Sequence, residues 1–191
     1  MGEIDISPFL YFYMNYFELY DLPVSVVVDQ ALVKKKYYQL SKEYHPDFYI
    51  NESEEKQAEI LELSTLNTNA YNTLREESKR IKYILDLYNQ SDDTQNEKLP
   101  QSFLMEMMDL NEKLMDLEFD VDENVILEVK NELNRHQENI LKLILPFSDD
   151  INALNDAKRK ESINKLKDYY LKSKYLLRIT ERLDKFAAAN K

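Results

Sequence analysis

The sequence lacks cysteine and contains only one glycine and two histidines among its 191 residues. Without cysteine the chain has no disulfide, no thiolate nucleophile, no cysteine zinc site and no iron–sulfur cluster held by its own side chains. Phosphate-binding loops and dinucleotide-binding turns need glycines that accept positive φ or allow close backbone approach. The composition therefore excludes nucleotide enzymes of those kinds, and His45 and His136 alone leave little for metal chemistry.

Long apolar runs are also missing, since the most apolar stretch, residues 9–14, is too short to span a bilayer. The acidic N-terminus lacks the arginines of a transit peptide and the basic start and apolar core of a secretory signal. The chain carries 36 acidic and 25 basic side chains, a formal charge of −11. We therefore expect a cytoplasmic protein with no nucleic-acid partner and no membrane partner. The mitochondrial matrix is the alternative if a transit peptide has been removed.

What the sequence does contain is typical of helices. Hydrophobic residues make up 43% of the chain, enough for a core. The scarcity of glycine and proline and the three-to-four spacing of apolar residues predict an all-α protein. Residues 89–98 hold no apolar side chain and predict a domain boundary. We expect a first domain over 15–88, a linker over 89–100 and a second domain over 101–191, with an N-terminal extension at 1–14.

The first domain is predicted to contain a short helix followed by a helical hairpin. A helix over 16–20 ends near Pro23, and Asp29 is a good N-cap for a helix over 30–44. A third helix begins within residues 53–56 and continues to Leu74, with the apolar residues at 81–85 extending it or following a break. Two long helices joined by a loop pack antiparallel. The core stripe of the first long helix is Val33, Tyr37, Leu40 and Tyr44.

The second domain is predicted to be a three-helix bundle. Its helices cover residues 101–118, 123–145 and 158–186, and Pro146 ends the second one. Residues 147–157 fit two alternatives, a further short helix capped within Ser148-Asp149-Asp150 or a plain bridge between the last two helices.

The sharpest local feature is Tyr44-His45-Pro46-Asp47, between a basic helix and a second long helix. Proline fixes φ and excludes the preceding residue from the helix, which predicts an exposed, rigid corner. The segment from Asp29 to His45 has a local charge of +2 on a molecule of −11, an electrostatic basis for steering a partner. The ordinary alternatives are a loop histidine and a solvated lysine face.

The order of these features resembles a J domain, the module through which DnaJ-type co-chaperones engage a DnaK-type ATPase chaperone. It comprises Tyr16-Phe17-Glu18-Leu19, the lysine-bearing helix, His45-Pro46-Asp47, and the run from Leu66 to Leu74. The resemblance implies that His45, Pro46 and Asp47 contact the junction of the chaperone's nucleotide-binding domain and linker and trigger its ATP hydrolysis. Lys35 and Lys42 would steer the approach, with Lys34 and Lys36 as further candidates.

The second informative feature is the predicted helix after Pro100. Its core seam consists of Phe103, Met107, Leu110, Leu114, Leu117 and Val121. Leu104, Met105 and Met108 fall off that seam, and the acids Asp109, Glu112 and Asp116 continue their stripe. From Phe103 to Asp122 the local charge is −6. An exposed Leu-Met-Met cluster is typical of a docking patch, whereas a wide core face that buries all three is the alternative.

This helix resembles the start of the client-binding domain of HscB-type co-chaperones. In that family it binds the iron–sulfur scaffold protein IscU. The resemblance implies that the client site here comprises Leu104, Met105, Met108, Asp109, Glu112, Asp116 and an aromatic on the last helix, for which Tyr175 is the best match. Tyr169 and Tyr170 are alternatives if the register differs, and all three fit a core as well.

One segment and two single positions depart from the family pattern. Glu76-Glu77-Ser78 stands where relatives often have a proline, so the third helix has no proline to end it there. Positions 109 and 116 carry aspartate where glutamate is common, which shortens each side chain and keeps its charge.

We interpret the chain as a non-enzymatic co-chaperone without a cofactor or metal. It would bring an IscU-type scaffold to a DnaK/HscA-type chaperone and stimulate that chaperone's ATPase. The alternatives are a J protein with another client and a plain helical adaptor whose His-Pro-Asp sequence is accidental.

Overall fold

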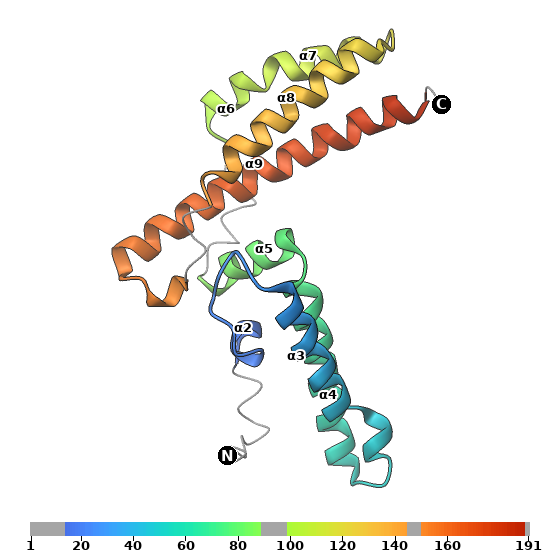
Figure 1. The fold of residues 1–191 in the computed structure, drawn as a ribbon, viewed down its shortest axis with the longest axis vertical. Helices are drawn as coiled ribbons and strands as arrows, with labels where there is room; N and C mark the ends of the chain where they lie inside the picture. Colours follow the sequence, from blue (N-terminus) through green and yellow to red (C-terminus); the bar gives the residue numbers. More distant parts are fainter. Residues whose placement is uncertain (1–13, 89–98, 145–149, 190–191) are drawn as a thin grey trace. The chain divides into compact units, whose positions relative to one another are not determined.

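The computed structural model describes residues 14–88, 99–144 and 150–189. Every regular element in these ranges is an α-helix or a short 3₁₀ helix, so the predicted all-α class is confirmed (Figure 1). The predicted extension at 1–14 and linker at 89–100 lie almost wholly outside the described residues.

The described residues form two compact units. The first unit ends at Ile84 and also takes in residues 150–155. The second unit contains the other described residues, from Leu85 onward.

The first unit opens with the short helix α2, Tyr16–Leu19. Asn15 caps it, because its side chain accepts the N–H groups of Phe17 and Glu18, and the Glu18 carboxylate accepts the Asn15 N–H at 2.9 Å. This reciprocal capping box satisfies donors that a free helix end leaves unpaired. Phe17 is fully buried, so the cap fixes an apolar anchor of the core.

The predicted hairpin consists of α3, Gln30–Glu43, and α4, Glu54–Leu74. Asp29 caps α3 as predicted, and Ser53 caps α4 by accepting the Lys56 N–H. The short 3₁₀ helix η1, Pro46–Tyr49, lies in the loop between them. Three members of the predicted core stripe of α3 are buried, namely Val33, Leu40 and Tyr44, and the half-buried Tyr37 stacks on Tyr71 with ring centroids 4.3 Å apart.

Asn67 on α4 connects three elements of the first unit by hydrogen bonds. Its side-chain amide donates to the Tyr37 carbonyl oxygen at 3.1 Å and to Ser41 Oγ at 3.0 Å. The Tyr20 hydroxyl donates to Asn67 Oδ1 at 2.8 Å. Both Asn67 and Tyr20 are buried, and burial raises the pKa of Tyr20 above its ordinary value, with Tyr37 adding to the effect. The folded state therefore holds Tyr20 in its neutral form.

This raised pKa predicts a loss of stability in alkali. Below pH of about 10 the phenol is neutral in both states; above it the unfolded chain releases the Tyr20 proton while the folded chain holds it, so unfolding becomes more favourable as pH rises. We expect Tyr20→Phe to show a shallower fall in the free energy of unfolding between about pH 9 and pH 11. At neutral pH the variant should lose about 1–3 kcal/mol, because the buried Asn67 Oδ1 is left without the Tyr20 donor.

Urea unfolding across that pH range measures both effects. Tyr38→Phe is the matched control, because Tyr38 is 60% exposed and should keep the wild-type slope. Equal slopes for the wild type and Tyr20→Phe would contradict the assignment.

Helix α4 ends at Leu74, and a separate helix, α5, covers Glu77–Leu87. Of the two alternatives left open for residues 81–85, a helix after a break is therefore the one observed, and a third helix that continues past Glu76 is not. The physical reason is Arg80, whose guanidinium is buried and donates to the carbonyl oxygens of Val26 and Leu74. The Leu74 carbonyl is thus occupied by a side chain, and the helix breaks without the proline that relatives often have.

Residues 150–155 settle one of the open alternatives in favour of a short helix. The 3₁₀ helix η4, Ile151–Ala153, is capped by Asp150, which accepts the Asn152 N–H at 2.9 Å. The Ile151 side chain is buried, and its N–H donates to the Val24 carbonyl at 2.9 Å. The other predicted capping residues, Ser148 and Asp149, lie outside the described residues.

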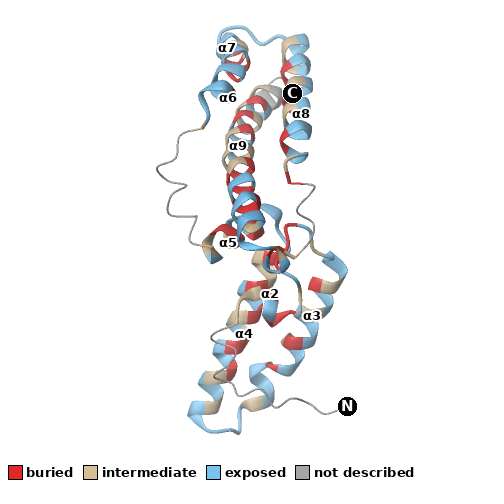
Figure 2. Cartoon of the chain, turned by 90° about the vertical axis from the view of Figure 1, so that its left-hand side faces the viewer, coloured by how far each residue is buried: buried red, intermediate tan, exposed pale blue. Residues whose placement is uncertain are grey.

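The second unit is the predicted three-helix bundle, in which two short helices form the first arm. These are α6, Gln101–Glu106, and α7, Met108–Asp116. The other arms are α8, Glu123–Leu141, and α9, Asp156–Ala189. Buried residues line the facing sides of α8 and α9 (Figure 2). They include Val129 and Leu133 on α8 and Leu166, Leu176 and Ile179 on α9.

The predicted single helix over 101–118 is wrong at Met107, where α6 and α7 meet. The carbonyl of Met107 accepts both the backbone N–H of Asn111, at 3.0 Å, and its side-chain amide, at 2.7 Å. Asparagine side chains that bond the preceding turn compete with regular helix geometry. Five of the six predicted seam residues are buried, but Val121 is 37% exposed because α7 ends at Asp116.

The ends of the other two helices also differ from the prediction. Helix α8 ends at Leu141, four residues early, and Leu143 and Ile144 continue in tighter turns that bond three residues back. Helix α9 is longer than predicted at both ends.

Candidate functional site

The predicted corner at His45 is an exposed turn at the C-terminal end of α3. His45 is the N-cap of η1, and Pro46 occupies its first position, where a missing N–H costs nothing. His45 Nδ1 accepts the Asp47 N–H at 3.3 Å, and the His45 carbonyl accepts the Phe48 N–H at 3.0 Å. The side chains of His45 and Asp47 are 50% and 83% exposed.

These bonds determine which groups the turn presents. Because Nδ1 accepts a hydrogen bond, the neutral His45 ring carries its proton on Nε2. The Asp47 carboxylate lies 3.8 Å from Nδ1, close enough to pair with the ring if it is protonated. The turn thus presents the Nε2–H donor of His45 and the carboxylate of Asp47 on a backbone that Pro46 makes rigid. This arrangement suits binding to a partner rather than catalysis.

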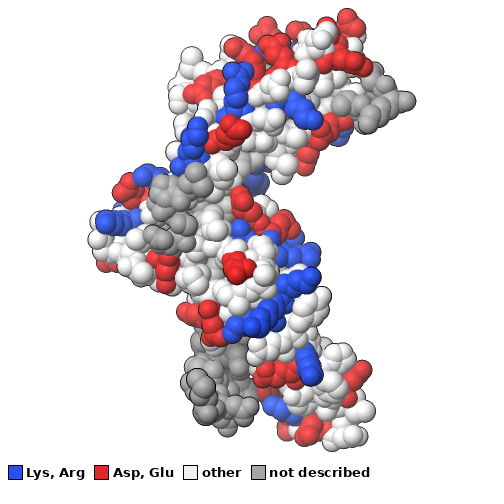
Figure 3. Space-filling view, in the orientation of Figure 1, with Lys and Arg blue, Asp and Glu red and all other residues white. Residues whose placement is uncertain are grey.

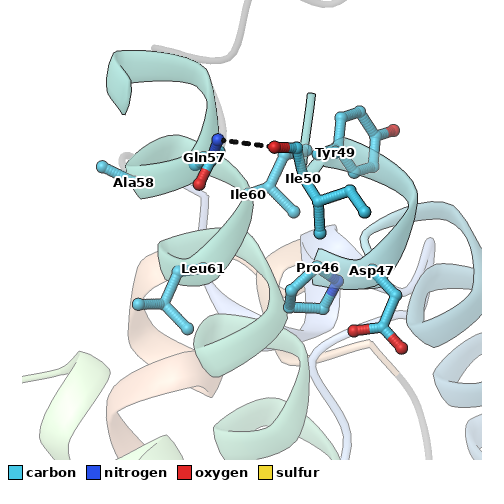
Figure 4. A pocket seen from close by; sticks show the side chains of 8 residues that line it. All are labelled: Pro46, Asp47, Tyr49, Ile50, Gln57, Ala58, Ile60 and Leu61. Atoms are coloured by element: carbon cyan, nitrogen blue, oxygen red, sulfur yellow. Dashed lines mark hydrogen bonds between the residues drawn. The ribbon is translucent and has the colours of Figure 1, made fainter. Parts of the chain in front are cut away.

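A groove lies beside this turn, between η1 and the first turns of α4 (Figure 4). Its volume is about 280 Å³. It is lined by Pro46, Asp47, Tyr49, Ile50, Gln57, Ala58, Ile60 and Leu61. The sequence did not predict this groove. Its two walls come from the turn after α3 and from α4, and no local sequence pattern determines how the loop places them relative to each other.

The predicted steering lysines differ in their availability. Lys34, Lys35 and Lys42 are exposed on α3, whereas Lys36 is less exposed and forms an ion pair with Asp21. Basic side chains gather over the part of the molecule that contains α3 (Figure 3). Lys35 and Lys42 therefore remain available to a partner, as the prediction requires.

On the second unit, the Leu-Met-Met cluster is exposed as predicted from the helical spacing. Leu104, Met105 and Met108 are 41%, 66% and 65% exposed. The alternative of a wide core face that buries all three is wrong. Two further apolar side chains, Met115 and Phe119, are 57% and 89% exposed. The spacing of seven residues between Met108 and Met115 is the signal that identifies Met115, since it keeps both on one side of α7, whereas Phe119 lies beyond the end of that helix.

The acids beside this cluster are uncompensated. Asp109, Glu112 and Asp116 are exposed and form no ion pair within the described part of the chain. Lys113, the lysine of α7, instead pairs with Glu128 at 2.7 Å and Glu132 at 3.0 Å on α8. These two hydrogen bonds raise the pKa of Lys113. The outer face of α6 and α7 is therefore apolar with one sign of charge.

Among the candidate aromatics of α9, Tyr175 lies next to this face. Its hydroxyl accepts the Asn111 side-chain amide at 2.8 Å, and its ring meets the Phe103 ring edge-on at 5.7 Å. Tyr175 is half-buried, whereas Tyr169 and Tyr170 are buried in the bundle. Tyr175 thus packs against α6 and α7 through Phe103 and Asn111.

Two kinds of feature were not found in the described ranges. No group of three histidine, aspartate or glutamate side chains there is arranged to hold a metal ion. No described helix is both long and apolar enough to cross a bilayer.

Comparison with protein families covers both units. A model described as DnaJ domain matches residues 15–83, and one described as HSCB C-terminal oligomerisation domain matches residues 99–184. The Co-chaperone protein HscB homolog of Colwellia psychrerythraea is 31% identical over 160 residues, which cover 82% of this chain and 90% of that protein. The chain belongs to the HscB co-chaperone family. The expectations of a J domain and of a non-enzymatic co-chaperone agree with this membership.

The chain is also similar to a further bacterial HscB sequence and to solved bacterial and human HscB structures. The Co-chaperone protein HscB of Proteus mirabilis is 30% identical over 126 residues, covering 64% of this chain and 72% of that protein. The solved Chaperone HscB from Vibrio cholerae has a TM-score of 0.63 at 23% identity, covering 91% of this chain and 99% of that one. Human co-chaperone protein HscB has a TM-score of 0.62 at 26% identity, covering 90% and 81%.

Proposed function

We propose that this HscB-family protein delivers an IscU-type iron–sulfur scaffold to a DnaK/HscA-type chaperone and stimulates the chaperone's ATPase. In this proposal His45, Pro46 and Asp47 engage the chaperone, and Lys35 and Lys42 steer its approach. The client binds Leu104, Met105 and Met108, with Asp109, Glu112, Asp116 and Tyr175 beside them. The protein supplies binding energy and positioning and performs no bond chemistry of its own.

One observation supports the proposal above the others, namely that each compact unit exposes its own separate recognition surface. The first unit exposes a stiff turn flanked by lysines, with His45 half exposed. The second unit exposes an apolar cluster flanked by acids, with Met105 and Met108 about two-thirds exposed. Two surfaces of opposite charge on one chain suit two different partners.

The proposal predicts synergy between the client and this protein. A tether that holds the scaffold near the chaperone raises the scaffold's effective concentration there. Steady-state ATPase of the cognate chaperone should therefore rise more when this protein and the scaffold are added together than the sum of their separate effects. Stimulation by this protein alone without synergy would favour a J protein with a different client. No stimulation at all would favour a plain helical adaptor.

A further inference from the structure

The groove beside the His45 turn is bordered by unusually exposed apolar side chains. Ile50 is 68% exposed and Leu61 is 59% exposed, and both line the groove. Phe48, from the same turn, is 68% exposed and its ring lies 5.5 Å from that of His45. Large apolar side chains that cluster on a surface indicate a contact site.

The groove is held in shape by hydrogen bonds across the loop. The Gln57 side-chain amide on α4 donates to the carbonyl oxygen of Ile50 at 3.2 Å (Figure 4). The same amide donates to the carbonyl oxygen of Glu52 at 2.9 Å. On the other side, the Tyr49 hydroxyl donates to the Glu43 carbonyl at 3.0 Å. Both walls are thus tied to helices, so the groove is formed before any partner arrives and little ordering entropy is lost on binding.

We propose that this groove receives an apolar side chain of the DnaK-type chaperone, with Ile50 and Leu61 as its contacts. The inference rests on the proposed function and adds a second contact to the same interface. Continuity with the turn favours this occupant, because Pro46 and Asp47 line the groove and also belong to the turn proposed to engage the chaperone. A protein that covers the turn also covers the groove edge.

The open form of the groove favours a side chain over a small molecule. Pockets for small ligands hold about 300–1,000 Å³ and enclose most of the ligand. This groove, of about 280 Å³, lies at the lower limit of that range and has walls from only two segments, so it would leave much of a ligand exposed. It presents a single charged group, Asp47, at one edge, and its other lining side chains are apolar or uncharged. An apolar side chain with a neighbouring cation for Asp47 fits this chemistry.

The test is a titration of chaperone ATPase with the full-length double variant Ile50→Ala/Leu61→Ala. The concentration for half-maximal stimulation should rise about tenfold, as loss of a small apolar anchor does, with the maximal rate retained at saturation. A change at His45 removes the maximal rate itself, so the two effects are separable. Leu127→Ala is the matched control, because Leu127 is 58% exposed on the second unit and should titrate as the wild type does.

Each result bears on the inference. The single variant Leu61→Met keeps the apolar volume of the side chain. A wild-type titration by this variant supports an apolar contact. Superimposed titrations of wild type and double variant overturn the groove contact and leave the proposed function intact. A wild type that fails to stimulate overturns the proposed function itself. Self-association of the wild type in sedimentation, removed by the double variant, identifies a second copy as the occupant and also overturns the inference.

Discussion

Replacing His45 with glutamine should reduce stimulation of the chaperone's ATPase to the basal rate and leave scaffold affinity unchanged. The imidazole of His45 accepts the Asp47 N–H through Nδ1 and offers Nε2–H outward on a fixed ring. Glutamine has a further rotatable bond and does not hold an acceptor and a donor at the two ends of one rigid ring. The turn should keep its course, because Pro46 fixes it. Single-turnover ATPase of the cognate chaperone measures the loss, and calorimetry with the scaffold measures the retained affinity.

The chain offers a matched control for this change. His136 is the only other histidine, and it lies on α8, in the second unit. His136→Gln should stimulate as well as the wild type. Stimulation that persists unchanged in His45→Gln would contradict the assignment of the turn as the trigger.

The double variant Leu104→Ala/Met108→Ala should bind the scaffold more weakly by about 1–3 kcal/mol, a loss of roughly 5- to 150-fold in affinity. Both side chains lie on the exposed face of α6 and α7, so the variant removes contact area without opening a cavity in the bundle. Calorimetric titration with the purified scaffold measures the change, and circular dichroism checks the helix content.

Leu141→Ala serves as its control, since Leu141 is 40% exposed at the end of α8 and Leu104 is 41% exposed. The ATPase stimulation by the double variant alone, without the scaffold, should equal that of the wild type. Wild-type scaffold affinity in the double variant would place the client site elsewhere on the chain.

The sequence predicted the helices well wherever an element depends on its own residues. Asp29 and Ser53 cap the hairpin helices, and the three-to-four spacing separates buried Leu110 from exposed Met108. These features are local, so a pattern of neighbouring residues is sufficient to reveal them.

Two helix breaks that the sequence did not determine lie where contacts far apart in sequence meet the helix. The break after Leu74 depends on Arg80 reaching the Val26 carbonyl, which is 54 residues away. The break at Met107 accompanies the bond from Asn111 to Tyr175, 64 residues away. Neither separation has a periodicity that a sequence pattern reveals, and tertiary context overrides local propensity at both points.

In the candidate sites, too, local features were predicted from the sequence and a feature that depends on distant segments was not. The exposure of His45 follows from the adjacent proline, and the exposure of Leu104 and Met105 follows from helical spacing. The groove at Ile50 and Leu61 depends instead on how the loop folds back onto α4, so it became evident only in three dimensions.

The return of residues 150–155 to the first unit affects how the protein can be divided for study. Ile151 belongs to the core beside Val24, although α8 and α9 of the other unit flank it in sequence. A recombinant fragment that ends at residue 88 would leave the Val24 carbonyl without its donor and an apolar face uncovered. Dividing the chain within residues 89–98 therefore separates the first unit from part of its core. A J-domain fragment should include residues 150–155, for instance through a short engineered fusion.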